Sequence, residues 1–274
     1  MGFFERRDWN QVPRLRRAFV VALLLVLSQA AWTSAQEPRP TDVQTTDAAV
    51  APDGESRRID ADATRREANE PGVRWGRVVR QTLSFQGIQH SFFMTQQKSR
   101  DALKGPWVRD WFESASSPFV DPHWSDGGSF LINYIGHPMG GSTYAYIYRQ
   151  NDPSATGIEF GRKGYATHLA KAMGMSALWS AQWEIGPFSE ASVENVGKPP
   201  DRYKMAWIDF VVTPTAGVGW MAGEDALDRF VIKKLERDID SAAGRAAIRI
   251  LLNPTRSMAN VMAGQKPWKR EGRR

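Results

Sequence analysis

The chain of 274 residues contains no cysteine. This absence excludes disulfide bonds, a cysteine nucleophile, thiolate metal sites and a lipid anchor on cysteine. Most of the chain also lacks an excess of basic charge, although the net charge is +6. The first 35 residues hold five basic and two acidic residues and the last ten hold five and one, which leaves 26 basic against 27 acidic residues between them. This near neutrality argues against a nucleic-acid partner.

Several catalytic motifs are missing as well. The chain has no G-x-S-x-G nucleophile motif, no P-loop and no H-E-x-x-H zinc motif, and its four histidines are scattered. The glycines of residues 217–223 miss the dinucleotide-binding spacing by one residue, and they lie in a stretch that we expect to be helical. We therefore expect no cofactor, and the sequence leaves open whether the protein is an enzyme.

The N-terminus has the order of features found in a secretory signal peptide. Arg14, Arg16 and Arg17 precede an apolar run over residues 18–27, and small residues follow at 33–35. This order predicts a cleaved signal peptide over residues 1–35 and export to the periplasm or the outer membrane. A retained anchor is the alternative, because the apolar segment is only marginally too short to span a bilayer. The adjacent arginines also leave export by the twin-arginine route open beside the general secretory route.

The composition divides the remaining chain into three parts. Residues 36–73 contain no aromatic side chain and are rich in Asp, Thr, Ala, Pro and Arg, which predicts a disordered linker. Residues 74–264 are expected to form one α-helical domain, and residues 265–274 a basic tail. Apolar stretches separated by short polar breaks are typical of an all-α bundle, here with helices interrupted by Pro and Gly. The expected helices cover residues 77–103, 107–113, 130–149, 165–185, 205–230 and 242–252, with a loop over 118–128.

Two of these stretches are nearly long enough to cross a membrane. Residues 130–148 and 205–223 contain one ionisable residue each, His137 and Asp209, but Gly, Pro and Thr reduce their hydropathy. Nine tryptophans follow residue 35, and Trp is common where an apolar surface meets water. We expect association with a membrane; in the alternative, the tryptophans fill a soluble core.

Three ionisable residues stand alone in apolar stretches, and they are the candidate site. They are His137, Glu184 and Asp209. A lone charge in an apolar helix is costly unless it is paired, so we expect the three side chains to meet in the interior of the bundle. Asn133, Thr213 and Glu224 are expected to extend this polar network.

The network has a structural and a catalytic interpretation. In the structural one, which we favour, the buried polar groups fix the register of the helices. Gly136-x-x-x-Gly140 and Gly219-x-x-x-Gly223 then allow close helix contact. In the catalytic one, the carboxylates orient His137 as a general base or metal ligand. One histidine and two carboxylates have no diagnostic zinc spacing, so we expect no metal.

The sequence His137-Pro138 suggests an anion site. A residue before proline is disfavoured in the helical region, so a helix is expected to begin here. The backbone of Gly140, Gly141 and Ser142 at its N-terminus is a candidate binding site for an anion such as a phosphate headgroup.

Four sequence blocks resemble an uncharacterised family of exported proteins from Gram-negative bacteria, a domain of unknown function. They lie at Asn133–Gly141, Ser180–Glu184, Asp209–Gly217 and Gly223–Glu224. The resemblance covers residues 81–264 and implies an α-helical domain associated with the cell envelope, without an established activity. One departure is Trp207-Ile208, where the family often has Pro-Ser.

Taken together, the residues and the resemblance predict a non-catalytic, membrane-associated helical domain that binds a membrane lipid or an envelope protein. The alternative is an envelope lipid or glycan hydrolase that uses His137, Glu184 and Asp209. The sequence does not indicate the oligomeric state.

Overall fold

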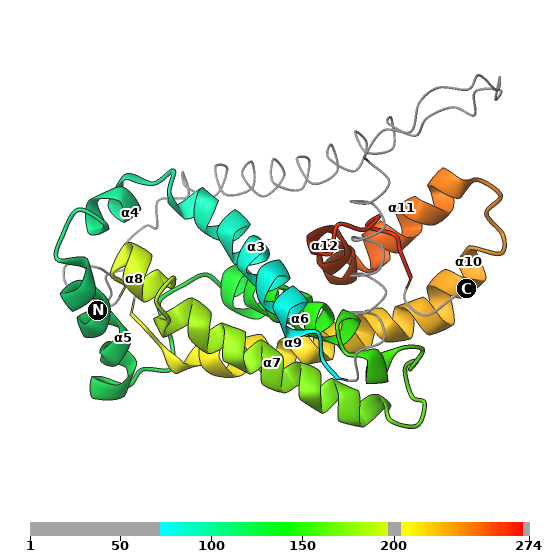
Figure 1. The fold of residues 1–274 in the computed structure, drawn as a ribbon, viewed down its shortest axis with the longest axis horizontal. Helices are drawn as coiled ribbons and strands as arrows, with labels where there is room; N and C mark the ends of the chain where they lie inside the picture. The colour runs from blue at the N-terminus through cyan, green and yellow to red at the C-terminus, as the bar shows by residue number, and fades with distance from the viewer. Residues whose placement is uncertain (1–71, 197–203, 271–274) are drawn as a thin grey trace, which may run out of the picture. The chain divides into compact units, whose positions relative to one another are not determined.

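The computed structural model describes residues 72–196 and 204–270, and within these ranges it contains helices and no strand (Figure 1). The expected all-α fold is confirmed. The predicted signal peptide and all but the last two residues of the predicted linker lie outside the described residues. The elements are α3 (Trp75–Phe93), α4 (Gln97–Ala102), α5 (Trp107–Val120), the π-helical η2 (Ile132–Gly136), α6 (His137–Gln150), the 3-10 helix η3 (Pro153–Ala155), α7 (Tyr165–Ile185), α8 (Glu190–Glu194), α9 (Trp207–Leu227), the π-helical η4 (Asp228–Ile232), α10 (Lys233–Leu235), α11 (Ala242–Leu252) and α12 (Pro254–Met262).

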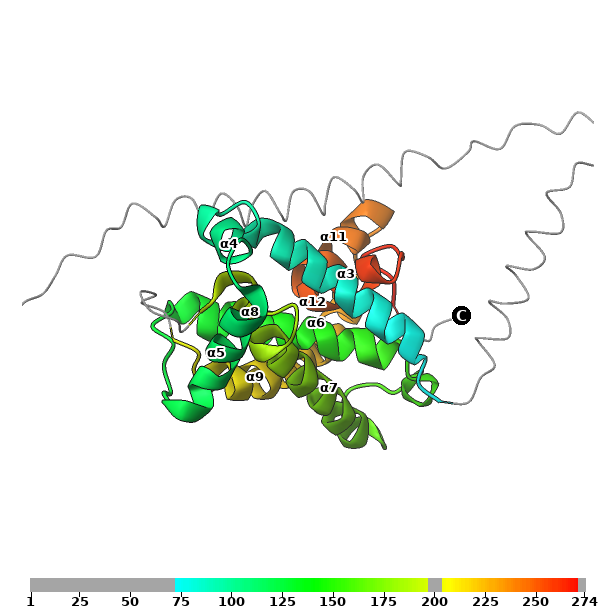
Figure 2. The same ribbon diagram turned by 60° about the vertical axis from the view of Figure 1, so that its left-hand side comes forward.

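Helix α6 is the centre of the fold. It packs against α9, α7, α12 and α3, and both ribbon views place it among these helices (Figure 1 and Figure 2). Tyr144, Tyr146 and Tyr148 alternate along α6, and all three are buried. Residues two apart point to different sides of a helix, so their common burial shows that neighbours surround α6. The alternating tyrosines therefore belong to a helix that is surrounded by other helices, and not to a strand.

Two glycines allow α6 and α9 to approach closely. A Cβ on Gly141 would lie 2.2 Å from the carbonyl oxygen of Thr213, and one on Gly217 would lie 3.0 Å from that of Pro138. By contrast, a Cβ on Gly140 would meet no neighbouring atom within 4 Å. The predicted Gly-x-x-x-Gly pairs are therefore not the contact glycines. The glycines at the contact are Gly141 and Gly217.

Local sequence sets several helix ends. Helix α7 follows Gly164, whose φ of +85° suits glycine, and it has the predicted bounds. Helix α11 also has its predicted bounds, because Ser241 caps its start and Asn253-Pro254 ends it. The predicted helix over 77–103 is instead divided into α3 and α4. The hydroxyl of Thr95 donates to the carbonyl of Phe92 at this break, in competition with the backbone.

Helix α5 runs to Val120, past the position where a loop was expected to begin. Pro118 lies inside this helix and has no N–H for the carbonyl of Ser114. The hydroxyl of Ser117 donates to that carbonyl at 2.7 Å, so the missing backbone hydrogen bond is replaced. The proline is therefore tolerated.

The C-terminal segment folds back onto the domain at least as far as Arg270. Asn260 donates to the carbonyls of Pro267 and Lys269, both at 2.8 Å. Arg270 donates to Asp228 and Glu236. These residues were expected to form a tail, but complementary acidic groups on η4 and just after α10 hold them.

No helix in the described parts of the chain combines the length and the hydropathy needed to cross a membrane.

Candidate functional site

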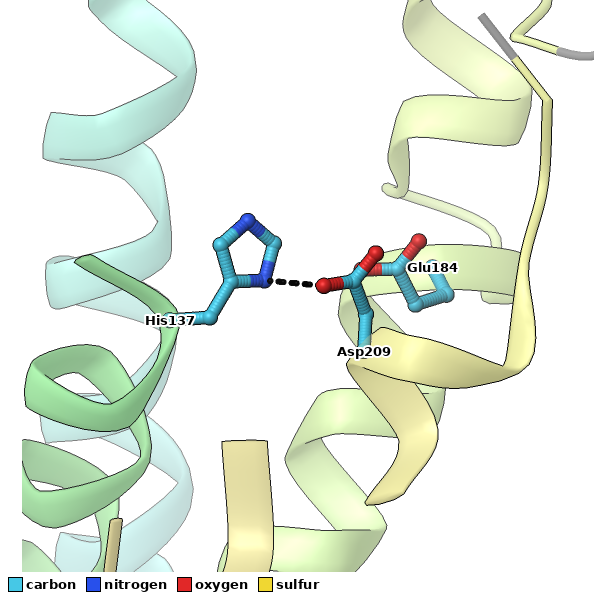
Figure 3. Close-up of side chains that lie close together, drawn as sticks. All are labelled: His137, Glu184 and Asp209. Atoms are coloured by element: carbon cyan, nitrogen blue, oxygen red, sulfur yellow. Dashed lines mark ion pairs between the residues drawn. The ribbon is translucent and has the colours of Figure 1, made fainter. Parts of the chain in front are cut away.

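His137, Glu184 and Asp209 lie together, although they come from three helices. His137 is the first residue of α6, Glu184 is in the last turn of α7, and Asp209 is in the first turn of α9. One side-chain nitrogen or oxygen of each lies within 4.8 Å of the others. Figure 3 shows the carboxylates side by side, facing one edge of the imidazole. Each carboxylate residue is only 3% exposed. We call these three residues the carboxylate–histidine cluster.

The contact between His137 and Asp209 is close but poorly aligned for a hydrogen bond. Nδ1 of His137 lies 3.1 Å from Oδ1 of Asp209, the pair joined by the dashed line in Figure 3. Yet Oδ1 has no hydrogen-bond partner among the described residues, because the ring N–H direction does not point along this line. The two groups are therefore neighbours whose attraction is electrostatic.

A π-helical turn places His137. Residues Ile132–Gly136 form η2, and the chain continues from it into α6 without leaving the helical region, with His137 at φ −61° and ψ −47°. The N–H of His137 donates to the carbonyl of Ile132 in the π-helical pattern, and the helix continues through Pro138. The break expected at His137-Pro138 is therefore absent.

The predicted anion site at Gly140, Gly141 and Ser142 is consequently not formed. These residues lie inside α6, which has no free N-terminus because η2 precedes it directly. Gly141 packs against the backbone of α9, and the hydroxyl of Ser142 is buried 2.7 Å from that of Thr255. The backbone of Gly141 and Ser142 is buried within a continuous helix and is not open to an anion.

Of the expected network partners, Asn133 lies on η2 and Thr213 on α9, and neither forms a hydrogen bond with the cluster among the described residues. The amide of Asn133 donates to Asp126 at 2.6 Å, and its own Oδ1 is buried without a partner among the residues that the structure describes. The buried hydroxyl of Thr213 also has no partner in the described parts of the chain.

Glu224 has a different role from the one expected. It accepts hydrogen bonds from the backbone N–H groups of Thr255 and Arg256 and from the hydroxyl of Thr255. These N–H groups belong to the first turn of α12, so Glu224 caps that helix. It lies outside the carboxylate–histidine cluster.

Two further carboxylates, Asp126 and Glu190, act on the cluster. Asp126 lies in the loop before η2, and Glu190 begins α8 and accepts from the indole N–H of Trp183 at 3.0 Å. In the sequence, Asp126 resembles a turn residue before Gly127-Gly128, and Glu190 resembles a helix-start residue after Ser189. Neither pattern indicates that the residue lies near the cluster. Only the tertiary fold brings them near His137 and Glu184.

Burial and mutual repulsion raise the pKa values of Glu184, Glu190 and Asp209. Burial, with Glu190, Asp209 and Asp126 nearby, holds the pKa of Glu184 well above its usual range. Burial raises the pKa of Glu190 to about 7, against the opposing effect of His137. Burial and then Asp126 raise the pKa of Asp209 to about 7. Burial lowers the pKa of His137, with Glu190 and Asp126 opposing.

Large apolar side chains are exposed around the cluster. Phe119 contacts Trp207 edge to face, with ring centroids 5.7 Å apart, and Phe130 stacks on Tyr134 at 4.9 Å. Backbone hydrogen bonds from Trp207 and Ile208 to residues 123 and 124 join the start of α9 to the loop after α5. We call this set the apolar end: Phe112, Phe119, Val120, Trp124, Phe130, Leu131, Ile132, Tyr134, Ile135, Trp207 and Val211.

A scan of protein-family models, a search of curated proteins and a search of solved structures each return no match to this chain. The function is therefore argued from the geometry.

Proposed function

We propose that the domain binds membrane lipid through its apolar end, with the lipid headgroup next to the carboxylate–histidine cluster. The observation that carries the proposal is the number of exposed aromatic and aliphatic side chains on α5, the loop after it, η2 and the start of α9, which pack against or belong to the helices that hold the cluster. Extended apolar patches of this kind are unfavourable in water and mark interaction surfaces. The predicted export and the resemblance to envelope proteins would place this surface at the periplasmic side of a membrane.

The make-up of the apolar end favours a bilayer over a protein partner. Its side chains project from a helix end, a loop and a π-helical turn, namely from Phe119 in α5, Trp124 in the loop and Ile132 in η2. Insertion of such side chains into a bilayer requires no complementary shape. Trp and Tyr have a polar atom on an apolar ring, which suits the headgroup region.

Binding to vesicles tests the proposal. The chain from Gln36 onward, the predicted mature form, is sedimented with vesicles of phosphatidylethanolamine and phosphatidylglycerol, because residues 18–32 would bind vesicles by themselves. A triple variant replaces Trp124, Phe130 and Leu131 by Ser. Each replaced side chain contributes roughly 1–2 kcal/mol on insertion, so we expect the partition coefficient to fall by at least about a hundredfold.

The matched control replaces three exposed apolar residues outside the apolar end, Leu178, Leu235 and Leu251, by Ser. This control should bind as the unmodified chain does. An equal loss in both triple variants, or an unmodified chain that stays in the supernatant, would contradict lipid binding. The second result would favour a protein partner at the same surface.

One observation favours a second candidate function, the hydrolysis of an envelope lipid or glycan. Asp209 lies beside Nδ1 of His137, and Figure 3 shows the other ring nitrogen pointing away from both carboxylates. A carboxylate beside one imidazole nitrogen can orient the other to act as a general base. Mass spectrometry of vesicle lipids incubated with the protein would detect cleavage, and His137→Gln should abolish cleavage while vesicle binding remains. Unchanged lipids would remove this candidate.

A further inference from the structure

Most buried carboxylates of this protein have a partner that offsets their burial. Asp225 lies between Arg149 and Arg256, and Glu224 accepts N–H groups at the start of α12. Glu184 and Asp209 differ. No Lys or Arg in the described parts of the chain forms an ion pair with either, and Oε1 of Glu184 and Oδ1 of Asp209 are buried without hydrogen-bond partners. Buried charges of this kind are ordinarily paired or bound to a metal.

We propose that His137, Glu184 and Asp209 bind one divalent transition-metal ion. One donor atom of each residue lies within 4.8 Å of the other two, with both carboxylates on the same side of the imidazole (Figure 3). Two ligand atoms bonded to one ion at 2.0–2.2 Å, with about 90–110° between the bonds, lie roughly 2.8–3.6 Å apart. The 3.1 Å between Nδ1 of His137 and Oδ1 of Asp209 fits this separation.

The poor alignment of that contact also fits a shared ion. In a hydrogen bond, the N–H points along the line to the acceptor oxygen. When two ligands bind one ion, both lone pairs point instead to a third position beside that line. The short distance between Nδ1 and Oδ1 without hydrogen-bond geometry is therefore what two ligands of one ion would show.

The donor set selects the class of ion. An imidazole nitrogen with two carboxylates suits Zn²⁺ and neighbouring first-row ions, whereas Ca²⁺ and Mg²⁺ prefer oxygen ligands alone. Asp126 and Glu190 add negative charge close by, which a divalent cation would offset. The hydroxyl of Ser180 donates to the backbone carbonyl of Asp209 at 2.9 Å and ties the start of α9 to α7, so two of the three ligand-bearing helices are fixed to each other.

This assignment differs from the expectation of no metal, which rested on spacing. The ligands lie 25 to 72 positions apart and belong to three helices, so no short motif connects them. The metal site is independent of lipid binding, because it is formed by groups already together in the fold.

Calorimetric titration of the full-length, chelator-treated chain with ZnCl2 tests the proposal, with MnCl2, MgCl2 and CaCl2 as further probes. We expect one equivalent of Zn²⁺ to bind, more tightly than Mg²⁺ or Ca²⁺. His137→Gln, Glu184→Gln and Asp209→Asn should each weaken Zn²⁺ binding by at least about tenfold. At the same concentration, Zn²⁺ should raise the melting temperature of the unmodified chain more than that of these variants.

A second histidine–aspartate pair provides matched controls. Nδ1 of His168 lies 3.5 Å from Asp152, but Lys171 also lies 3.7 Å from that carboxylate and supplies the cation. His168→Gln and Asp152→Asn should therefore bind Zn²⁺ as the unmodified chain does. Absence of stoichiometric Zn²⁺ binding to the unmodified chain would overturn the proposal whether or not any variant folds. Unchanged binding by His137→Gln would overturn it as well.

Discussion

Asp225 is a buried carboxylate near the C-terminal end of α9, and four side chains donate to it. Arg149 and Arg256 donate to its two oxygens, and the hydroxyls of Tyr146 and Tyr165 donate at 3.0 and 2.9 Å. Burial alone would raise the pKa of Asp225, but the two guanidinium groups and these hydrogen bonds hold it below its usual range. The charged form is therefore the one that stabilises the fold.

We expect Asp225→Asn to lower the free energy of unfolding by about 3–5 kcal/mol, because it removes the buried anion that the guanidinium groups of Arg149 and Arg256 share. Urea denaturation of the purified variant measures this loss. Asp228→Asn is a comparison with a smaller expected effect, since Asp228 is shared between Arg256 and Arg270 in a less enclosed position. Equal losses in the two variants would contradict a dominant role for Asp225.

The same contact predicts an acid dependence of stability. A carboxylate whose folded pKa is lowered contributes stability that is complete above the unfolded pKa, about 3.9 for Asp, and is lost as the pH falls through the folded pKa. The melting temperature of the unmodified chain should therefore fall more steeply between pH 5 and pH 3 than that of Asp225→Asn. All other acids are common to both proteins, so the difference reports Asp225. Parallel curves would show that its pKa is not lowered.

Single residues explain how far the site followed from the sequence. A lone ionisable residue in an apolar stretch can be recognised from the sequence. Because burying such a residue alone is unfavourable, the sequence predicted that His137, Glu184 and Asp209 meet, and they do. Glu224 looked the same in the sequence, yet it caps a helix about thirty residues later. Asp126 and Glu190 looked like turn and helix-start residues. Which partner a buried acid meets is a property of the tertiary fold, so these three roles were not predictable.

At the scale of elements, helix ends were predictable where local chemistry sets them and not where neighbours do. Gly164 and the Ser241 cap fixed the starts of α7 and α11. By contrast, α5 continues through Pro118 because the hydroxyl of Ser117 serves the carbonyl of Ser114. Helix α6 begins without a break because η2 precedes Pro138. Neither Pro118 nor Pro138 therefore ends a helix. At Pro118 a hydroxyl replaces the missing donor, and at Pro138 the helix continues from a π-helical turn.

Two adjacent glycines allow the contact between α6 and α9 to be tested. Gly141→Ala would place a Cβ against the Thr213 carbonyl, so we expect a loss of about 1–3 kcal/mol in the free energy of unfolding. Gly140→Ala adds the same methyl group into open space, and the better helix propensity of Ala should stabilise the protein by about 0.5–1 kcal/mol. Chemical denaturation of both variants measures the opposite signs. A similar change in both would show that α6 and α9 are not closely packed.

At the scale of the whole molecule, the charge division seen in the sequence has a structural counterpart. The basic C-terminal end is held by acids, because Arg270 pairs with Asp228 and Glu236. The acids of the carboxylate–histidine cluster have no such basic partner among the described residues. The domain thus has one region where arginines offset buried acids. In a second region, beside the apolar end, the described buried acids form no ion pair with Lys or Arg, and there the proposed cation and lipid would bind.

The central position of α6 makes a prediction about local stability across the domain. Helices α6 and α11 have similar lengths and their own backbone hydrogen bonds, but nine residues of α6 are buried and none of α11. Amides exchange through openings whose free energy depends on the packing that must be broken. We therefore expect α6 amides to exchange only on global unfolding and α11 amides about tenfold faster or more, in hydrogen–deuterium exchange at neutral pH. Gly141→Ala should speed exchange in α6 in proportion to its loss of global stability, while Gly140→Ala should not. Equal protection of α6 and α11 in the unmodified chain would contradict the central role of α6.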